Sequence, residues 1–224
     1  MRVAALYDIH GNLPALEAVL RELEGEDVDE IVFGGDIAAG PLPRETLALV
    51  RSLAAHSIRG NADRPNDEAP GATWVWEQLD DDETAWLEGL PETLVLGHVL
   101  FCHAVPGSDM ERVTELTSDE RLAGLLEGVE QPLVVAGHTH MQLDRRVGPT
   151  RFVNAGSVGM PYEARPGAYW AIVGEDVEMR RTDYDLEAAA ARIRATAWPL
   201  AQEFADENVL RIPSREEALA VFGG

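Results

Sequence analysis

Short apolar runs and amphipathic stretches alternate along the first part of the chain. Residues 3–7 (VAALY) and 30–36 (EIVFGGD) each contain a short apolar run followed by an aspartate, which predicts two buried strands. Between them, apolar residues recur on one helical face from Leu13 to Leu23, with Pro14 in the first turn. The chain therefore begins with a predicted strand, a helix and a second strand.

The same alternation continues to about residue 90. A helix is predicted near 43–54, followed by a short strand over 57–63 (SIRGNAD). Residues 73–90 have a helical pattern, and the acidic run DDDE at 80–83 suits the first turn of a helix. Strands that alternate with helices favour an α/β fold with a parallel sheet.

Strands dominate the middle of the chain, and helices dominate its end. The predicted strands lie in 93–103, with a tight hairpin at Gly97-His98, in PLVVAGHTH (132–140), in 150–159, and in a hairpin over 168–181 that turns at 174–176. From Asp185 the pattern is helical, Pro199 interrupts it, and Ser214 and Glu217 form a capping box for a last helix. We therefore divide the chain into an α/β body (1–182) and a helical appendage packed on it (183–224).

Length and cysteine content point to one domain in a reducing compartment. A chain of 224 residues buries enough surface to fold without disulfides, and its single cysteine, Cys102, forms no internal disulfide. The sequence has no apolar run of 18 residues and no signal-peptide pattern at its start. We therefore expect a soluble, cytoplasmic protein with no membrane partner.

Charge and the absence of lysine exclude several functions. The net charge of −22 argues against a nucleic-acid duplex as partner, because phosphate backbones attract clustered cations. A small phosphate ester remains compatible, since a local metal ion can neutralise its charge. The chain has no lysine, which removes a P-loop lysine, a Schiff-base lysine and a Ser-Lys pair from consideration.

Metal-binding side chains follow five of the predicted apolar segments. In α/β sheets the carboxyl ends of strands are where ligand sites form, so these side chains are expected to meet. Carboxylates, imidazoles and one amide oxygen suit Mn, Fe, Zn or Ni better than calcium, which takes only oxygen ligands. The candidate ligands are Asp8, His10, Asp36, Asn61, His103, His138 and His140.

The order of these motifs resembles the calcineurin-like metallophosphoesterase superfamily. The segments DIHGN, GGD, GNAD, FCH and GHTH stand where that family carries its five metal-binding blocks. The resemblance covers roughly 1–182, and it is strongest to the small bacterial and archaeal phosphodiesterase-type members. It implies a metallo-dependent phosphatase fold, which is a four-layer α/β sandwich of two mixed β-sheets flanked by helices.

The resemblance also implies a dinuclear centre and assigns its ligands. One metal would be held by Asp8, His10 and His140, the other by Asn61, His103 and His138, and Asp36 would bridge the two. The ions would be divalent transition metals, with Mn first and Fe, Ni or Zn as alternatives. A metal-bridging hydroxide would attack phosphorus in line, so Asp36, Asn61 and His138 are also expected to act in catalysis.

The expected activity is hydrolysis of a small phosphate ester, with nucleotides among the candidates. Many members of the family carry a histidine after the asparagine of the third block, where it protonates the leaving oxygen or steadies the phosphoryl group. This chain has Ala62 there, which favours phosphodiesters or phosphoanhydrides with good leaving groups. The alternatives are a phosphomonoesterase of broad specificity and a non-catalytic metal-binding scaffold of the same fold, as in the retromer subunit. Either a monomer or a homo-oligomer is compatible with the sequence.

Three further residues are candidates for substrate contact. Asn12 follows the first ligand pair, although a helix N-cap is the alternative role. Asp63 ends the GNAD segment and either orients a ligand or caps a loop. Arg165 is a candidate phosphate clamp.

Several neighbouring residues are expected to shape the site. Gly35, Gly60 and Gly137 each precede a ligand and are expected to let the backbone turn tightly there. Asn154 and Ser157 are expected to contact substrate or the ligand-bearing loops. Specificity is expected to depend on the segments 64–92, 104–130 and 160–167, while Cys102 is expected to be a buried core thiol.

Overall fold

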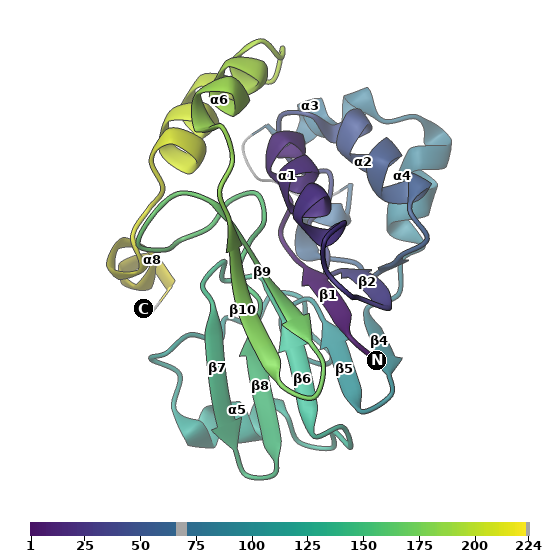
Figure 1. Cartoon of the computed structure of the whole chain (residues 1–224), viewed down its shortest axis with the longest axis vertical. Coiled ribbons are helices and arrows are strands. Elements are labelled where there is room, and N and C mark those ends of the chain that lie inside the picture. The colour runs from purple at the N-terminus through teal and green to yellow at the C-terminus, as the bar shows by residue number, and fades with distance from the viewer. Residues whose placement is uncertain (66–70, 223–224) are drawn as a thin grey trace.

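The computed structural model describes residues 1–65 and 71–222, which fold around two five-stranded mixed sheets (Figure 1). The first sheet has the order β10-β9-β1-β2-β3 and the second the order β4-β5-β6-β8-β7. The strands of the first sheet are β1 (Val3–Leu6), β2 (Glu30–Phe33), β3 (His56–Ser57), β9 (Ala168–Val173) and β10 (Val177–Thr182). Those of the second are β4 (Thr93–Leu96), β5 (Val99–Cys102), β6 (Leu133–Ala136), β7 (Leu143–Val147) and β8 (Thr150–Asn154).

Helices pack on the outer faces of both sheets, and further helices pack together in a separate cluster. They are α1 (Leu13–Leu23), α2 (Pro43–Ser52), α3 (Ala72–Gln78), α4 (Asp81–Glu88), α5 (Asp119–Leu125), α6 (Leu186–Arg194), α7 (Ala201–Phe204) and α8 (Arg215–Phe222), with a 3-10 turn at Asn61–Asp63 and a π-helix at Ala205–Leu210. None of the helices within residues 1–65 and 71–222 is long and apolar enough to cross a membrane.

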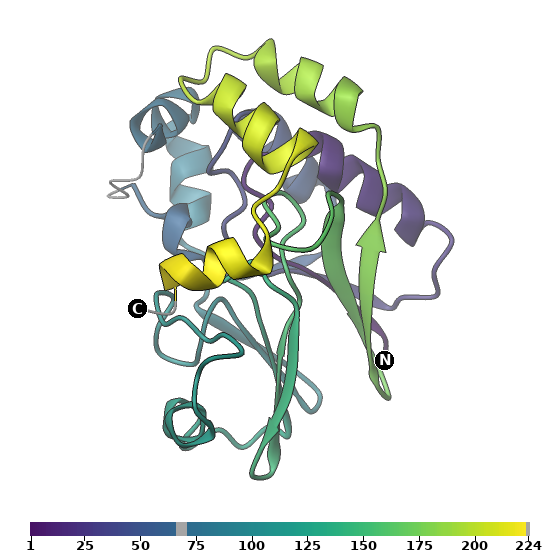
Figure 2. The same cartoon turned by 90° about the vertical axis from the view of Figure 1, so that its left-hand side faces the viewer.

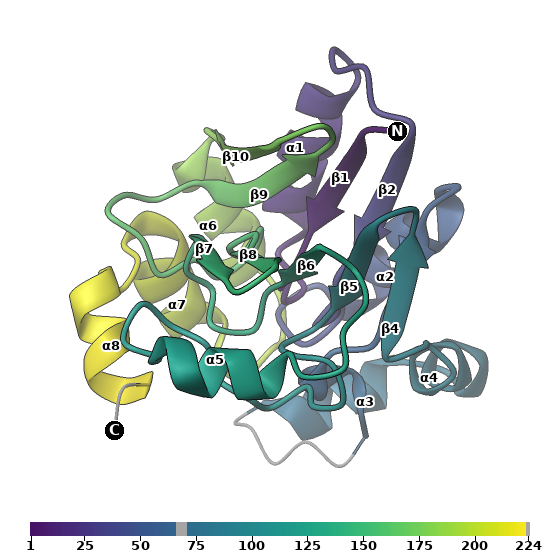
Figure 3. The same ribbon diagram turned by 90° about the horizontal axis from the view of Figure 1, so that it is seen from below.

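Three apolar cores separate four layers. Leu6 and Phe33 pack against α1 and α2 on the outer face of the first sheet. Tyr7 and Phe101 belong to the core between the two sheets. On the outer face of the second sheet, Phe152 packs with residues of α5, which lies below that sheet in Figure 3. The four-layer α/β sandwich expected from the sequence is confirmed.

The parallel strand pairs align the ends of the strands that precede the candidate ligands. In the first sheet Leu6 of β1 is paired with Phe33 of β2. In the second sheet β5 is parallel to β6, with Phe101 opposite Val135. Since parallel neighbours end at the same edge of a sheet, the loops that follow β1, β2, β5 and β6 lie together.

Some local predictions differ from the structure. The strand predicted over 57–63 is limited to His56–Ser57, because the chain then forms the 3-10 turn at Asn61–Asp63. The stretch 73–90 forms two helices, and Asp80 begins the second with a capping box to Glu83. Cys102 is buried in the core beneath α5, as expected.

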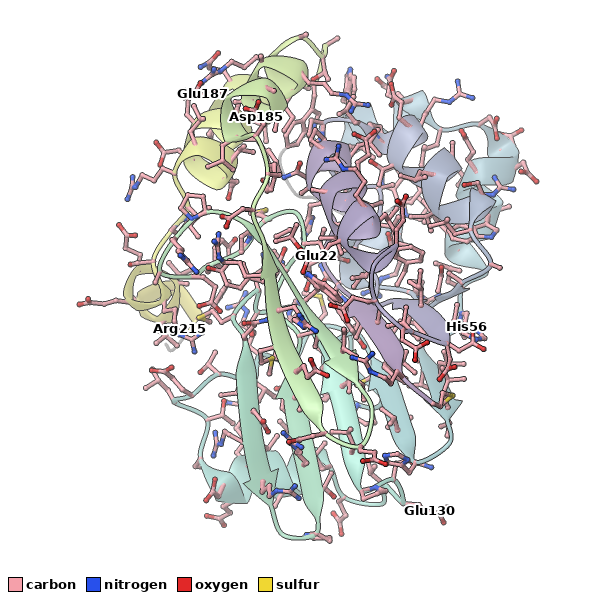
Figure 4. All side chains as sticks on the ribbon, in the orientation of Figure 1. Glu22, His56, Glu130, Asp185, Glu187 and Arg215 are labelled. Carbon is pink, nitrogen blue, oxygen red and sulfur yellow. The ribbon has the colours of Figure 1, made fainter. Side chains whose placement is uncertain are left out.

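The C-terminal helices follow β10 and lie beside the loops at the strand ends (Figure 2). Arg215, labelled in Figure 4, begins α8 and forms ion pairs of 2.9 Å with both Glu115 and Glu163. The capping box predicted from Ser214 and Glu217 is present. The division of the chain at residue 182 into body and appendage stays a prediction.

Candidate metal centre

Backbone hydrogen bonds join the first two ligand-bearing loops. The Asp8 amide donates to the Gly35 carbonyl (3.2 Å), and the His10 amide donates to the Asp36 carbonyl (2.8 Å). A third bond runs from the Gly11 amide to the Ile37 carbonyl (3.0 Å). The loop after β1 therefore lies directly against the loop after β2.

Five of the candidate ligands have a left-handed backbone. Their φ angles are positive, at 52° for Asp8, 48° for His10, 53° for Asp36, 69° for His138 and 57° for His140. Within the described residues, no other residue except glycine has a positive φ. This conformation costs a non-glycine residue roughly 1–3 kcal/mol, and such residues cluster at functional sites. The strain therefore marks the same loops that the sequence motifs mark.

The carboxylates of Asp8 and Asp36 are buried among imidazole rings. Asp36 Oδ2 lies 3.6 Å from His10 Nε2 and 3.5 Å from His103 Nε2. Asp8 Oδ1 lies 3.4 Å from His140 Nε2 and 3.8 Å from His103 Nε2. Asp36 thus stands between a ligand of each predicted metal, as a bridging residue requires.

Three histidines use their Nδ1 atoms to contact backbone carbonyls. These bonds run from His10 to the Ala39 carbonyl (3.2 Å), from His103 to the Gly34 carbonyl (2.8 Å) and from His140 to the Met160 carbonyl (2.7 Å). An Nδ1–H that donates in this way fixes the ring orientation and leaves Nε2 for a metal. The Nε2 atoms of His10 and His140 accordingly face each other at 3.1 Å.

Two further ligands lie beside His103. Its Nε2 is 3.1 Å from the Asn61 side-chain oxygen, and its ring centroid is 5.2 Å from that of His138. His138 is tied to the first group as well, because its backbone amide donates to Asp8 Oδ2 (2.8 Å). The structure therefore brings all seven predicted ligands to one place.

The donor set fits metal binding. Asp8 Oδ1 is buried and has no hydrogen-bond partner within the described residues, although burying such an atom unpaired is costly. Asp8, His10 and His140 direct ligand atoms within 4.8 Å of one another, and so do Asp8, Asp36 and His103. A cation in each group would satisfy the unpaired oxygen and separate the two facing imidazole nitrogens.

Burial and neighbouring charges shift the pKa values of Asp36 and His138 toward the unprotonated forms that bind metal. Burial alone would raise the pKa of Asp36, but His103 and His10 hold it well below its usual range. Burial lowers the pKa of His138 to about 4, and the neighbouring charge of His103 adds to this effect. At neutral pH, Asp36 is therefore an anion and His138 is a neutral imidazole with a free electron pair.

His103 has the opposite shift. Burial would lower its pKa, but the charges of Asp36 and Asp8 outweigh burial and raise the pKa to about 10. Without a metal, a proton on this ring balances part of the buried negative charge. A metal must displace that proton, so acid is expected to weaken metal binding.

Buried polar residues hold the ligand loops in place. Asp63 accepts hydrogen bonds from the backbone amides of Asp36 (2.7 Å), Ile37 (2.9 Å) and Gly60 (2.9 Å). Asn154 donates to the Gly137 carbonyl, and the Ser157 hydroxyl donates to the Asp8 carbonyl (2.7 Å). Asp63, Asn154 and Ser157 thus contact the loops that carry the ligands.

The hydrogen bonds of the other two predicted substrate contacts go to residues other than the candidate ligands. Asn12 is fully buried, where its oxygen caps α1 at the Ala15 amide and its nitrogen donates to the Gly159 carbonyl (2.8 Å). Arg165 is exposed, and its carbonyl accepts the Tyr169 hydroxyl. A role in substrate binding stays a prediction for both residues.

Two glycines of the site are required for space rather than for their backbone angles. Gly35 has a φ of +95°, as a tight turn demands. Gly60 has an ordinary φ of −98°, but a Cβ there would collide with the amide and carboxylate of Asp36. At Gly137 a Cβ would lie 2.5 Å from Asp8 Oδ2. Glycine is therefore needed at positions 60 and 137 because the backbone passes close to Asp36 and Asp8, and not because the chain turns tightly there.

We expect Gly60→Ala to release metal from the site. Because the Cβ meets Asp36 and the φ is ordinary, the effect should come from displacement of that carboxylate. Elemental analysis is expected to find at least half of the metal lost. Gly124→Ala is the matched control, since that position in α5 has no atom within 4 Å of an added Cβ. Equal metal contents in the two variants would contradict the expected displacement of Asp36.

The sequence did not reveal the walls around the cluster. The Tyr162 ring stacks on His140, with ring centroids 4.9 Å apart. A pocket of about 410 Å³ opens beside His10 and Asn61, and much of its far wall belongs to the C-terminal segment. The segments expected to control specificity contribute Gly71, Ala72, Val75 and Met160 to this pocket, and their role in specificity stays a prediction.

Comparison with known proteins places these features in a family. The sequence profile of the calcineurin-like phosphoesterase superfamily domain matches residues 1–176. The uncharacterised protein MJ0912 of Methanocaldococcus jannaschii is 25% identical over 229 residues, which covers 85% of this chain and 91% of that protein.

Two solved structures resemble most of the chain. A metallophosphoesterase from Sphaerobacter thermophilus has a TM-score of 0.77 and 29% identity, with 90% of this chain and 97% of that chain covered. The hypothetical protein PH1004 from Pyrococcus horikoshii has a TM-score of 0.78 and 23% identity, with 94% and 99% covered. The second comparison supports the fold alone.

Proposed function

Because the chain belongs to the calcineurin-like phosphoesterase superfamily, we propose that it hydrolyses phosphate esters with two divalent metal ions. The observation that carries the proposal is the position of Asp36, whose Oδ2 lies 3.6 Å from His10 Nε2 and 3.5 Å from His103 Nε2. Asp8, His10 and His140 would hold one metal, Asn61, His103 and His138 would hold the other, and Asp36 would bridge the two. Manganese is our first choice, with iron, nickel and zinc as alternatives.

The chain's own residues prepare the site before substrate arrives. Backbone carbonyls fix the rings of His10, His103 and His140. The Ala62 amide holds Asp36 Oδ1 at 2.8 Å, so the carboxylate needs little rearrangement on binding. When bound, two cations would lower the pKa of a water molecule and neutralise charge on the phosphoryl oxygens.

The small side chain at Ala62 supports phosphodiesters or phosphoanhydrides as substrates. Ala62 lines the pocket and its amide contacts Asp36, so this position lies beside the metal ligands. A methyl group donates no proton to a leaving oxygen, and general acid catalysis is typically worth ~10²–10⁴-fold. Alkyl monoesters need that proton most, because their leaving groups are the poorest.

We expect the metal-reconstituted protein to have a higher kcat/KM for an aryl phosphodiester than for an alkyl phosphomonoester. Ala62→His should raise kcat/KM for the alkyl ester by roughly tenfold or more, because an imidazole there could protonate the alkoxide. The control is Ala191→His on the exposed face of α6. Faster hydrolysis of alkyl monoesters than of diesters by the natural chain would contradict this role of Ala62.

A further inference from the structure

The pocket beside the candidate metal centre connects two parts of the chain that are far apart in sequence. Its inner side contains His10, Asn61 and Ala62, so it reaches a ligand of each predicted metal. The opposite side contains Trp198, Leu200, Glu203, Phe204 and Asn208 of the C-terminal segment. Its volume of about 410 Å³ lies in the range typical of small-molecule sites, ~300–1,000 Å³.

The far wall is held in place by specific contacts. The indole Nε1–H of Trp198 donates to the Gly71 carbonyl at 3.3 Å, and this joins the C-terminal segment to the start of α3. The Trp198 and Phe204 rings pack edge to face, with centroids 5.5 Å apart. Gly71 leaves room for this arrangement, since a Cβ there would lie 2.6 Å from Trp198 Nε1. The wall is therefore an ordered part of the fold.

A π-helix forms part of the same wall. Phe204 ends α7, and the chain continues as a π-helix over Ala205–Leu210, which includes Asn208 of the pocket lining. π-helices are uncommon and are found frequently at functional sites. This second observation directs attention to the wall independently of the metal ligands.

The lining is apolar and carries no positive charge. Most of its described residues are alanine, valine, leucine, methionine, tryptophan or phenylalanine, and none is arginine. The Glu203 side chain adds a negative charge at an exposed position. A second phosphate bound here would find no cation among the described lining residues and would face the negative charge of Glu203. An uncharged apolar group would instead gain from leaving water.

We propose that this pocket binds an uncharged, apolar ester arm of the substrate, of about the size of an aromatic ring. This inference rests on the proposed function and restricts the class of substrate. Of the two substrate classes left open, it favours phosphodiesters over phosphoanhydrides, because a further phosphate would gain no cation from the described lining of this pocket. The C-terminal segment thereby determines specificity, while the strand-end loops hold the reacting phosphoryl group.

Three phosphonates test the proposal by binding alone. Methylphosphonate, benzylphosphonate and phosphonoacetate share a phosphonate group that is not hydrolysed, and they differ only in a methyl, an aromatic or an anionic arm. Calorimetric titration of the metal-loaded protein is expected to give benzylphosphonate roughly tenfold or more tighter binding than methylphosphonate. Phosphonoacetate should bind more weakly than benzylphosphonate. Equal affinities for the methyl and benzyl compounds would overturn the proposal.

A charge reversal assigns the effect to the wall. Glu203→Arg is expected to tighten phosphonoacetate binding severalfold and to leave methylphosphonate binding nearly unchanged. Glu187→Arg makes the same change of charge in the C-terminal segment, on α6 and outside the pocket lining (Figure 4). It should leave all three affinities unchanged. An equal response of phosphonoacetate to the two variants would contradict a role for the pocket.

Hydrolysis of bis(4-nitrophenyl) phosphate, measured in parallel, distinguishes failure of the aryl pocket from failure of the proposed function. If the diester is hydrolysed but the three phosphonates bind equally, the proposed function stands and the aryl pocket does not. If benzylphosphonate binds selectively but neither this diester nor any other phosphate ester is hydrolysed with any of the four metals, the pocket stands as a binding site and the proposed function fails.

Discussion

Removal of the metal ions with a chelator is expected to abolish phosphodiester hydrolysis and to lower the midpoint of thermal unfolding. At a metal concentration of 100 Kd, one bound ion stabilises the folded state by ~2.7 kcal/mol. For a domain of this size that corresponds to a shift of roughly 5–10 °C. The buried Asp8 Oδ1 also predicts a lower unfolding midpoint after metal removal, because that oxygen has no hydrogen-bond partner within the described residues.

The Asp36→Asn variant isolates the predicted bridge between the ions. An amide retains the oxygen that accepts the Ala62 amide, but it lacks the negative charge that two cations share. We expect metal content to fall from about two ions per chain to about one, and kcat/KM to fall by roughly 100-fold or more. Elemental analysis and steady-state kinetics measure the two effects.

Asp81→Asn is the matched control for that variant. Asp81 is exposed in the first turn of α4, so it should keep both the metal and the rate. Full activity of the natural chain after complete metal removal would refute the proposed function itself, whatever the behaviour of Asp36→Asn.

The His138→Ala variant is expected to lose hydrolysis of an aryl phosphodiester almost completely while remaining folded. The low pKa of His138, about 4, leaves its imidazole neutral and able to bind a metal at neutral pH. The backbone amide that donates to Asp8 survives the substitution. Alanine tolerates the φ of 69° less well than histidine, so a small loss of stability is expected as well.

Two comparisons distinguish lost chemistry from lost folding. His138→Asn places a residue that tolerates a positive φ at the same position, and it should be as inactive as alanine but more stable. His98→Ala changes an exposed hairpin histidine and should affect neither property. If the natural chain hydrolyses no ester with any of the four metals, the alternative of a non-catalytic scaffold replaces the enzyme.

The central strands and the meeting point of the candidate ligands were predictable because each depends on local sequence. Buried parallel strands are short apolar runs, and Asp8, Asp36 and His103 each follow such a run within three residues. The alternating order of strands and helices then brings the strand ends to one edge. Local pattern and topology were sufficient to predict which side chains meet.

The edges of the structure were less predictable for a physical reason. β7 (LDRRV) is an edge strand whose charged residues are partly or fully exposed, so it lacks the apolar run of a buried strand. In α5 only Leu122 is buried, which leaves almost no apolar periodicity. The pocket wall at Trp198 and Phe204 results from tertiary packing about 60 residues beyond His140, the last candidate ligand, and no local pattern encodes it.

The left-handed backbone at five candidate ligands means that selection for stability alone would act against the site. Glycine adopts these φ angles without strain, so replacement of Asp8, His10, Asp36, His138 or His140 by glycine would relieve strain in the metal-free chain. Each replacement would also remove a candidate metal ligand. A screen for thermostable variants in the presence of chelator would therefore enrich inactive sequences, whereas the same screen with excess metal would select against them.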